Sequence, residues 1–273
     1  MKRFEGVLLC TDLDGTLLQS DHTVSRENLD AISYFQNEGG LFTFVTGRMP
    51  FCARDIYETV RPNAPIGCIN GGGIYDFCND CYVWTIELPK EAKALVLHAI
   101  ENIPALGVQV NSFDHIYFCR ENSAMQWFRE VTGMPNLVRR YDEVCELIAK
   151  IVFGDKNQEH IDALRKLLDE HPLSERFDFI RSERTLYEIL PKGVSKGTVL
   201  LKLAEHLNID MRKTIAVGDY NNDVSMIRAA GIGIAVANAV DEAKACADHT
   251  TVSNDEHAIA RIINDLESGI LKL

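Results

Sequence analysis

The chain has 273 residues, 46% of them hydrophobic and 25% charged, which is enough apolar material for one large domain or two modest ones. Its formal net charge of −12 argues against nucleic acid and anionic membranes as partners, because like charges repel. A phosphorylated substrate would also be repelled, unless a metal ion and a few cationic or N–H groups are gathered locally.

Neither a signal peptide nor a membrane span is expected. The N-terminal apolar run, residues 7–11, is too short for either, and no later run reaches the length of a span. The eight cysteines lie mostly within apolar runs, as is typical of a reducing compartment. The sequence therefore predicts a soluble, cytoplasmic protein.

The first part of the chain alternates predicted strands with predicted helices. Its apolar runs lack polar alternation, which is typical of strands buried on both faces of a parallel sheet. Ser25 is placed to cap the first helix, and Gly39-Gly40 to end it. Strands are predicted at 6–11, 41–46 and 65–70, and helices at 26–38 and 50–60.

The middle of the chain has a different pattern, with two predicted hairpins at 107–120 and 177–190. A further strand is predicted at 148–153, and helices are predicted near 90–102 and 158–170. We interpret residues 84–190 as an inserted α+β domain.

The alternation of strands and helices returns near the C-terminus. Strands are predicted at 214–218 and 232–236, and helices at 196–207, 222–230, 240–247 and 256–267. Residues 1–83 and 191–273 together predict a discontinuous core, built on a doubly wound, Rossmann-like α/β sheet.

The first predicted strand runs into Asp12-Leu-Asp-Gly-Thr16. Asp12 and Asp14 are two positions apart, so on an extended strand they project to the same side. Neighbouring carboxylates repel each other unless a cation or a shared proton lies between them, and Mg²⁺ prefers such oxygen ligands. The pair predicts a metal site, although an Asp-x-Asp alone is more often a turn device.

Other strand ends carry groups that suit an anion. Thr46-Gly47-Arg48 follows the second predicted strand and supplies a hydroxyl, an open backbone N–H and a cation. Asn70-Gly71-Gly72-Gly73 follows the third with further backbone donors. Each segment alone would be an ordinary turn or helix start.

The C-terminal half adds carboxylates and a lysine. Asp219, Asn222 and Asp223 follow the strand at 214–218, where Asp223 could also simply cap the next helix. Lys196 opens a helix, at the end where the helix dipole disfavours a cation, and a bound anion would resolve this conflict. Four strand ends or helix starts thus carry metal-type or phosphate-type groups, and this coincidence favours a function over separate structural roles.

These segments resemble the four motifs of the haloacid dehalogenase superfamily of phosphohydrolases. The matching segments are Asp12-Leu-Asp-Gly-Thr16, Thr46-Gly-Arg48, Lys196 and Gly218-Asp-Tyr-Asn-Asn-Asp223. The Cof-like subfamily is the most similar, because it also has Asn-Gly-Gly after the third strand and an α/β cap inserted between the second and third motifs. The resemblance covers the whole chain.

The resemblance implies a Mg²⁺-dependent phosphatase of small phosphorylated metabolites. Asp12 would be the nucleophile that forms an aspartyl phosphate, and Asp14 the general acid and then the general base. The implied metal ligands are Asp12, Asp219, the backbone carbonyl of Asp14, and Asp223 either directly or through another ligand. The implied phosphate-binding groups are Thr46, Lys196, Asn222 and the backbone N–H groups of Leu13 and Gly47, with Arg48, Asn70 and Gly71 as candidate substrate contacts.

Three other functions share part of this pattern: a phosphotransferase or sugar phosphomutase on the same scaffold, a receiver-like protein that is phosphorylated but not catalytic, and a degenerate binding protein. Intact motifs and a large insertion argue against the last two. Arg181, Arg184 and Glu188 in the last cap hairpin could reach a substrate, but exposed hairpin positions are the favoured interpretation. Cys78-Asn-Asp-Cys81 has the spacing of half a zinc site, and no second pair at metal spacing accompanies it.

Overall fold

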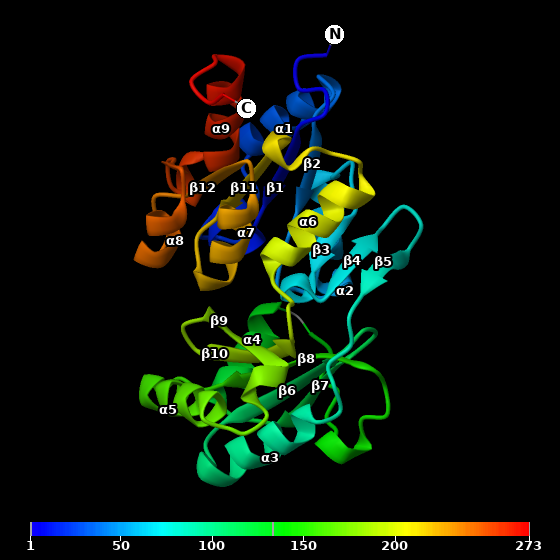
Figure 1. The fold of residues 1–273 in the computed structure, drawn as a ribbon, viewed down its shortest axis with the longest axis vertical. Coiled ribbons are helices and arrows are strands. Elements are labelled where there is room, and N and C mark those ends of the chain that lie inside the picture. The colour runs from blue at the N-terminus through cyan, green and yellow to red at the C-terminus, as the bar shows by residue number, and fades with distance from the viewer. Residues whose placement is uncertain (1, 133, 273) are drawn as a thin grey trace. The chain divides into compact units, whose positions relative to one another are not determined.

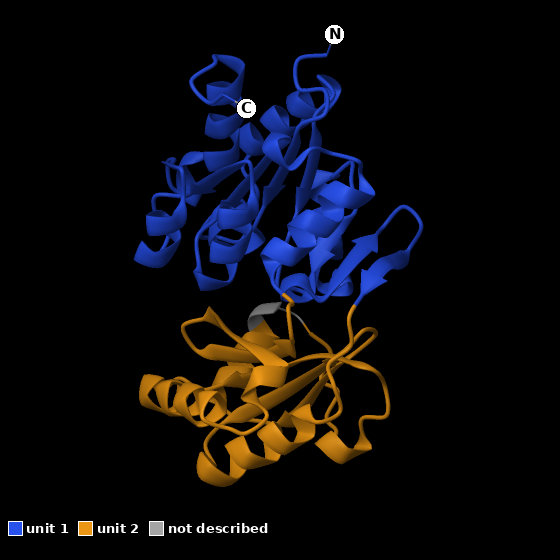
Figure 2. Ribbon diagram, viewed as in Figure 1, with its two compact units in different colours: residues 1–85, 195–273 blue, residues 86–194 orange. Residues whose placement is uncertain are grey.

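The structure is a computed structural model that describes residues 2–132 and 134–272. It contains two compact units (Figure 2): a core unit, Met1–Thr85 with Ser195–Leu273, and a cap unit, Ile86–Val194. The chain enters the cap two residues later than expected from the sequence, at 86 rather than 84, because strand β5 (Cys81–Thr85) still belongs to the core unit. It leaves the cap after residue 194 rather than 190, once strand β10 (Leu186–Pro191) is complete.

The core sheet is parallel throughout, as predicted. Its strands are β1 (Leu8–Thr11), β2 (Leu41–Phe44), β11 (Thr214–Gly218), β12 (Ile232–Ala235) and β13 (His249–Thr250), in the order β13-β12-β11-β1-β2 (Figure 1). Leu8 pairs with Leu41 on one side and with Thr214 on the other. Strands from the N-terminal and C-terminal parts of the chain therefore share one sheet.

Helices cover both faces of this sheet. Leu8, Cys10 and Ala216 pack against α6 (Lys196–His206) and α7 (Val224–Ala229), which lie over the near face in Figure 1. Side chains alternate along a strand, so Leu9 and Ile215 point to the opposite face. There α1 (Arg26–Asn37) and α9 (Ala258–Glu267) pack together. The predicted cap of α1 is confirmed, since the Ser25 hydroxyl accepts a hydrogen bond from the Asn28 N–H at 3.2 Å.

The predicted third strand is only loosely part of the parallel sheet. β3 (Ile66–Cys68) contacts the extension of β2 through a single parallel bridge between Val45 and Gly67. Its other edge pairs with the antiparallel hairpin of β4 (Gly73–Asp76) and β5, which the sequence did not predict. The core unit also contains α2 (Pro50–Val60) and α8 (Asp241–Cys246).

The cap unit is an antiparallel sheet with helices on it. Its strands are β6 (Gly107–Ser112), β7 (Ile116–Arg120), β8 (Ile148–Gly154), β9 (Phe177–Glu183) and β10, in the order β7-β6-β8-β10-β9. α3 (Ala92–Asn102) and α5 (Gln158–Asp169) pack on one face. α4 (Ser123–Thr132) was not predicted. Glu188 on β10 is 2% exposed, so the expectation that it is exposed was wrong, whereas Arg184 is exposed.

Short turns of helix complete the described chain. Leu13–Leu17 forms one such turn after β1, with Gly15 at a φ of +80°. The others are Ile69–Gly71, Tyr141–Glu143, Ser174–Arg176, Met211–Lys213, Asn221–Asp223 and Asn254–Glu256.

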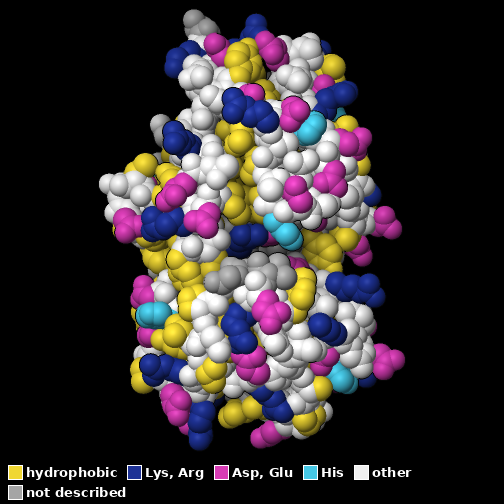
Figure 3. Space-filling model, turned by 180° about the vertical axis from the view of Figure 1, so that it is seen from behind, with side chains coloured by type: hydrophobic (Ala, Val, Ile, Leu, Met, Phe, Trp, Pro, Cys, Tyr) yellow, Lys and Arg dark blue, Asp and Glu magenta, His cyan; other side chains and the backbone are white. Residues whose placement is uncertain are grey.

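Charged side chains of both signs are interspersed over the face shown in Figure 3, so the net negative charge does not gather into one patch there. Within the described residues, no helix combines the length and the apolar character that a membrane crossing requires.

Candidate active site

The candidate site lies at the carboxyl ends of two neighbouring strands of the core sheet, β1 and β11. β1 has β2 on one side and β11 on the other, and Asp12 and Asp219 follow the carboxyl ends of β1 and β11. In open α/β sheets this position, the topological switch point, is where ligands bind. The two carboxylates are brought together by the pairing of strands that are far apart in the sequence.

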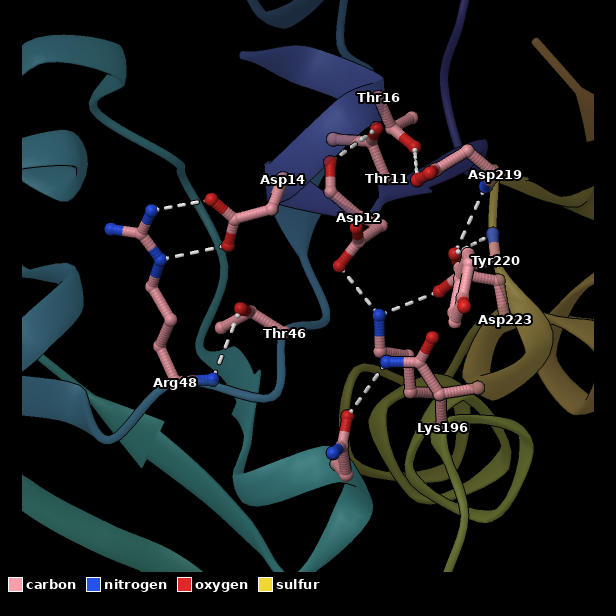
Figure 4. A network of polar contacts seen from close by, with 12 residues as sticks. Thr11, Asp12, Asp14, Thr16, Thr46, Arg48, Lys196, Asp219, Tyr220 and Asp223 are labelled. Carbon is pink, nitrogen blue, oxygen red and sulfur yellow. Dashed lines mark hydrogen bonds and ion pairs between the residues drawn. The ribbon is translucent and has the colours of Figure 1, made fainter. Parts of the chain in front are cut away.

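Lys196 joins the carboxylates around this point (Figure 4). Its Nζ lies 2.5 Å from Asp12 Oδ1 and 2.6 Å from Asp223 Oδ1, and the side chain is 1% exposed. Burial alone would lower the pKa of Lys196, but the charges of Asp12 and Asp223 outweigh it and raise the pKa above its usual range. The anions that resolve the unfavourable position of this lysine at a helix start are therefore carboxylates of the protein itself.

Asp223 organises the turn after β11. Its Oδ2 accepts hydrogen bonds from the backbone N–H groups of Asp219 at 2.9 Å and Tyr220 at 3.0 Å. Its other oxygen is bound by Lys196. Asp219 Oδ1 in turn accepts a hydrogen bond from the Thr16 hydroxyl at 2.7 Å, which connects the turn after β11 to the turn after β1.

Three carboxylates form a group that could hold a metal ion. One oxygen each from Asp12, Asp219 and Asp223 lie within 4.8 Å of one another. Burial raises the pKa of Asp12 well above its usual range, opposed by Lys196 and reinforced by the other carboxylates. Burial and the charge of Asp223 raise the pKa of Asp219 to about 7. An all-oxygen donor set in which the pKa values of Asp12 and Asp219 are raised fits a hard cation such as Mg²⁺, because a bound cation favours the ionised carboxylates.

Asp14 points away from this group. Its Oδ2 and Oδ1 accept hydrogen bonds from Arg48 Nε at 2.9 Å and Nη2 at 2.5 Å (Figure 4). The expectation that Asp12 and Asp14 project to the same side was wrong, because the chain stops being extended at Leu13 and turns at Gly15. Arg48, a candidate substrate contact, is thus engaged by a carboxylate of the protein.

Polar groups after β2 and β3 meet those after β11. The Asn222 amide donates to Asn70 Oδ1 at 3.0 Å, and both side chains are buried. The Thr46 hydroxyl accepts a hydrogen bond from the Arg48 N–H at 3.2 Å. Gly47 lies against Asn70, since a Cβ on Gly47 would be 2.8 Å from Asn70 Oδ1.

Comparisons with known proteins identify the family. A model of the haloacid dehalogenase-like hydrolases matches residues 9–263, nearly the whole chain. The chain belongs to the haloacid dehalogenase-like hydrolases. A putative phosphatase of Bacillus subtilis, YxeH, is 30% identical over 95% of this chain and 97% of its own. The 5-amino-6-(5-phospho-D-ribitylamino)uracil phosphatase YitU of the same organism is 27% identical over 94% and 96%.

Solved structures have the same fold. A haloacid dehalogenase-like hydrolase from B. subtilis has a TM-score of 0.83 and 28% identity, and covers 97% of this chain and 99% of its own. The sugar phosphatase BT4131 has a TM-score of 0.83 at 20% identity over 97% and 100%, which bears on the fold alone. The relatives are named phosphatases, and this haloacid dehalogenase-like hydrolase is a phosphatase.

The structure also places the two remaining predicted site residues of this hydrolase, Leu13 and Gly71. Leu13 is fully buried beside Asp12. Gly71 has a φ of +105°, and a Cβ there would lie 2.1 Å from the backbone oxygen of Ser195, the residue before Lys196. Gly71 therefore allows the segment after β3 to approach the start of α6.

Two residues near the site were missed from the sequence. The Asn238 amide donates to the Gly15 oxygen at 2.8 Å and ties the first turn to the segment after β12. Thr16 lies inside the first motif, so its place in the sequence indicated a role in the site. Nothing in the sequence indicated that its hydroxyl would donate to Asp219. No sequence pattern marks Asn238.

Proposed function

We propose that this protein is a Mg²⁺-dependent phosphatase of small phosphomonoesters, such as sugar phosphates, that forms a phospho-aspartyl intermediate on Asp12. The observation that carries the proposal is the buried Lys196, which binds Asp12 and Asp223 within a group of three carboxylates at the switch point. A buried lysine that neutralises a strand-end carboxylate also provides positive charge for a phosphoryl group.

Asp12, Asp219 and the backbone carbonyl of Asp14 would hold the metal ion. Asp223 already accepts hydrogen bonds from Lys196 and from two backbone N–H groups, so we assign it chiefly to holding Lys196 and the turn. When bound, Mg²⁺ supplies the positive charge that lets an anionic nucleophile approach an anionic phosphate.

In the first step, a carboxylate oxygen of Asp12 forms a bond to phosphorus while the bond from phosphorus to the leaving oxygen breaks. Asp14 gives its proton to that oxygen. In the second step Asp14 takes a proton from water as the water attacks phosphorus and releases Asp12. Both Asp14 oxygens accept hydrogen bonds from Arg48 here, so this role requires at least one of those bonds to open.

The phosphoryl oxygens would be held by Thr46, Lys196 and Asn222 and by the backbone N–H groups of Leu13 and Gly47. Arg48, Asn70 and Gly71 stay candidates for substrate contact. A relative that removes phosphate from a ribityl chain supports a substrate whose phosphate sits on a hydroxylated carbon chain. We further propose a cytoplasmic location and no nucleic acid or membrane partner, in keeping with the net charge of −12.

The test is phosphate release from an aryl phosphate and a panel of sugar phosphates, with and without Mg²⁺. Wild type should release phosphate only with Mg²⁺, and Asp12→Asn should lose at least about a thousandfold in kcat. Asp21→Asn, at an exposed aspartate, is the control for charge removal and should match wild type. Transfer of phosphate between sugars with little release would instead indicate a phosphomutase, and activity surviving in Asp12→Asn, with deamidation excluded, would assign another nucleophile.

A further inference from the structure

One loop of the core unit contacts both of the turns that carry the site carboxylates. Residues 236–240 follow β12, and β11 lies between β12 and β1 in the sheet. The Val240 N–H donates to the backbone oxygen of Asp219 at 2.8 Å, and the Asn238 amide donates to the backbone oxygen of Gly15, also at 2.8 Å. Because neighbouring strands lie about 4.8 Å apart, Asn238 reaches the turn after β1 from a strand about 10 Å away.

Asn238 is itself held by a second asparagine, and we call the two residues the amide bracket. Asn238 Oδ1 accepts a hydrogen bond from the Asn254 N–H at 3.0 Å, and the Asn254 amide donates to the Leu18 oxygen at 2.9 Å. The Leu18 N–H in turn donates to the Leu13 oxygen at 2.8 Å. The amide bracket therefore holds the turn after β1 at two points, Gly15 and Leu18.

This turn needs support from outside itself. A ψ of 117° at Asp14 and a φ of +80° at Gly15 depart from helical values, so regular helical hydrogen bonds do not fix the peptide between them. The turn begins directly after Asp12 and also carries Thr16, which donates to Asp219 (Figure 4). A rotation at Gly15 would therefore move several groups of the site together, and a misplacement of about 1 Å can cost about a hundredfold in rate.

We propose that Asn238 is a positioning residue, which sets the orientation of the turn carrying Asp14 through its hydrogen bond to Gly15. Its printed bonds go to backbone groups of Gly15 and Asn254, so it acts on the reaction only through the turn. The assignment rests on the function proposed above, because it assigns Asn238 a part in the reaction of Asp12 and Asp14.

Asn63 provides a matched control at the opposite end of the same sheet. Its amide donates to the Gly40 oxygen at 3.0 Å, and its Oδ1 accepts from the Phe42 N–H at 2.8 Å, at the amino end of β2. Asn63 and Asn238 are both exposed, and neither has a positive φ, so alanine introduces no backbone strain at either position. Each substitution thus removes one donated and one accepted hydrogen bond.

Asn238→Ala and Asn63→Ala should lower the melting temperature by similar amounts, because they remove the same number of hydrogen bonds. Only Asn238→Ala should lower kcat for phosphate release, by about tenfold, with KM changed by less than about twofold. Hydrogen exchange gives a readout that does not depend on activity. The backbone amides of residues 13–18 should exchange about tenfold faster in Asn238→Ala and at the wild-type rate in Asn63→Ala.

Equal kcat values in the two variants, or unchanged exchange at residues 13–18 in Asn238→Ala, would overturn the assignment. If wild type is active and the two variants have the same kcat, the positioning role fails and the phosphatase stands. If wild type releases no phosphate from any substrate, yet exchange rises only in Asn238→Ala, the phosphatase proposal fails and the hold of Asn238 on the turn stands.

Discussion

Lys196 Nζ lies 2.5 Å from Asp12 Oδ1, although the two residues are 184 positions apart in the sequence. The same ammonium binds Asp223, so one buried cation joins the end of β1, the start of α6 and the turn after β11. The three segments are therefore linked through the side chain of one residue.

Lys196→Met should be both inactive and less stable. Removing one partner of a buried ion pair leaves uncompensated carboxylates, which costs about 3–5 kcal/mol in the free energy of unfolding. Urea denaturation measures this loss. Lys202→Met is the control on the same helix, where the lysine side chain is 44% exposed, and it should change stability by less than about 0.5 kcal/mol. Equal effects of the two substitutions would contradict the role given to Lys196.

Gly71→Ala should distort the start of α6. The new Cβ would lie 2.1 Å from the Ser195 backbone oxygen, and the φ of +105° is unfavourable for alanine, so we expect a loss of about 2–4 kcal/mol together with most activity. Gly193→Ala is a matched control, since Gly193 has a φ of +80° but no atom within 4 Å of a new Cβ. It should cost about 1 kcal/mol and keep activity. Thermal unfolding and phosphate release, measured side by side, compare the two.

Arg48 donates two hydrogen bonds to the two oxygens of Asp14, and this fork should give a measurable coupling energy. A double-mutant cycle with Arg48→Met and Asp14→Asn should show about 1–2 kcal/mol in unfolding free energy, because the Arg48 side chain is only 22% exposed. Arg140 and Asp142 form a similar fork at 3.1 Å, with side chains 75% and 50% exposed. Their cycle should give less than about 0.5 kcal/mol. A coupling near zero at Arg48 would mean that the fork does not persist in solution.

Magnesium should stabilise the protein through Asp219. At a concentration one hundred times its dissociation constant, a ligand of the folded state adds about 2.7 kcal/mol to the free energy of unfolding. The melting temperature of wild type should therefore rise with Mg²⁺. In Asp219→Asn the rise should be largely lost, and in Asp241→Asn, an exposed aspartate outside the carboxylate group, it should remain. A full Mg²⁺ response in Asp219→Asn would place the metal elsewhere.

The cap unit should become less stable in acid through His171. Burial and the neighbouring His98 lower the pKa of His171, and its Nδ1 already accepts a hydrogen bond from the Leu173 N–H at 3.1 Å. A depressed pKa means that the stability this group contributes is present above its ordinary pKa, about 6.5, and is lost as pH falls through the folded value. NMR titration of the ring should give a midpoint below 6.5, and His171→Asn should lessen the loss of stability between pH 7 and pH 5. A midpoint above 6.5 would contradict this.

The positions of the site residues could be predicted, but most of their partners could not. Asp12 and Asp219 follow apolar runs typical of parallel strands, and the carboxyl ends of such strands meet at one edge. Lys196 was expected to meet a bound anion, yet it binds two carboxylates of the protein. Which anion a lysine reaches depends on the distance between elements in the folded protein, and no local sequence pattern determines that distance.

In the fold, too, elements with a local sequence pattern could be predicted and elements that depend on tertiary contacts could not. The parallel strands and the long helices have clear periodic patterns, whereas α4 and the β4–β5 hairpin were missed. α4 is held by packing of Met125 against Gly107 and Gly154 of the cap sheet, a tertiary contact. The burial of Lys150 and Glu188 was equally invisible, because charged residues on alternating strand positions are typical of a solvated face.

The pairing of Leu8 with Thr214 has a consequence for how the chain is made. On the ribosome, one edge of β1 has no partner until β11 has emerged, whereas every strand of the cap lies between Gly107 and Pro191 and can pair sooner. An unpaired strand edge is a template for association with other nascent chains. The unit that is begun first is thus the one completed last, and during that interval its growing sheet is open to misassembly.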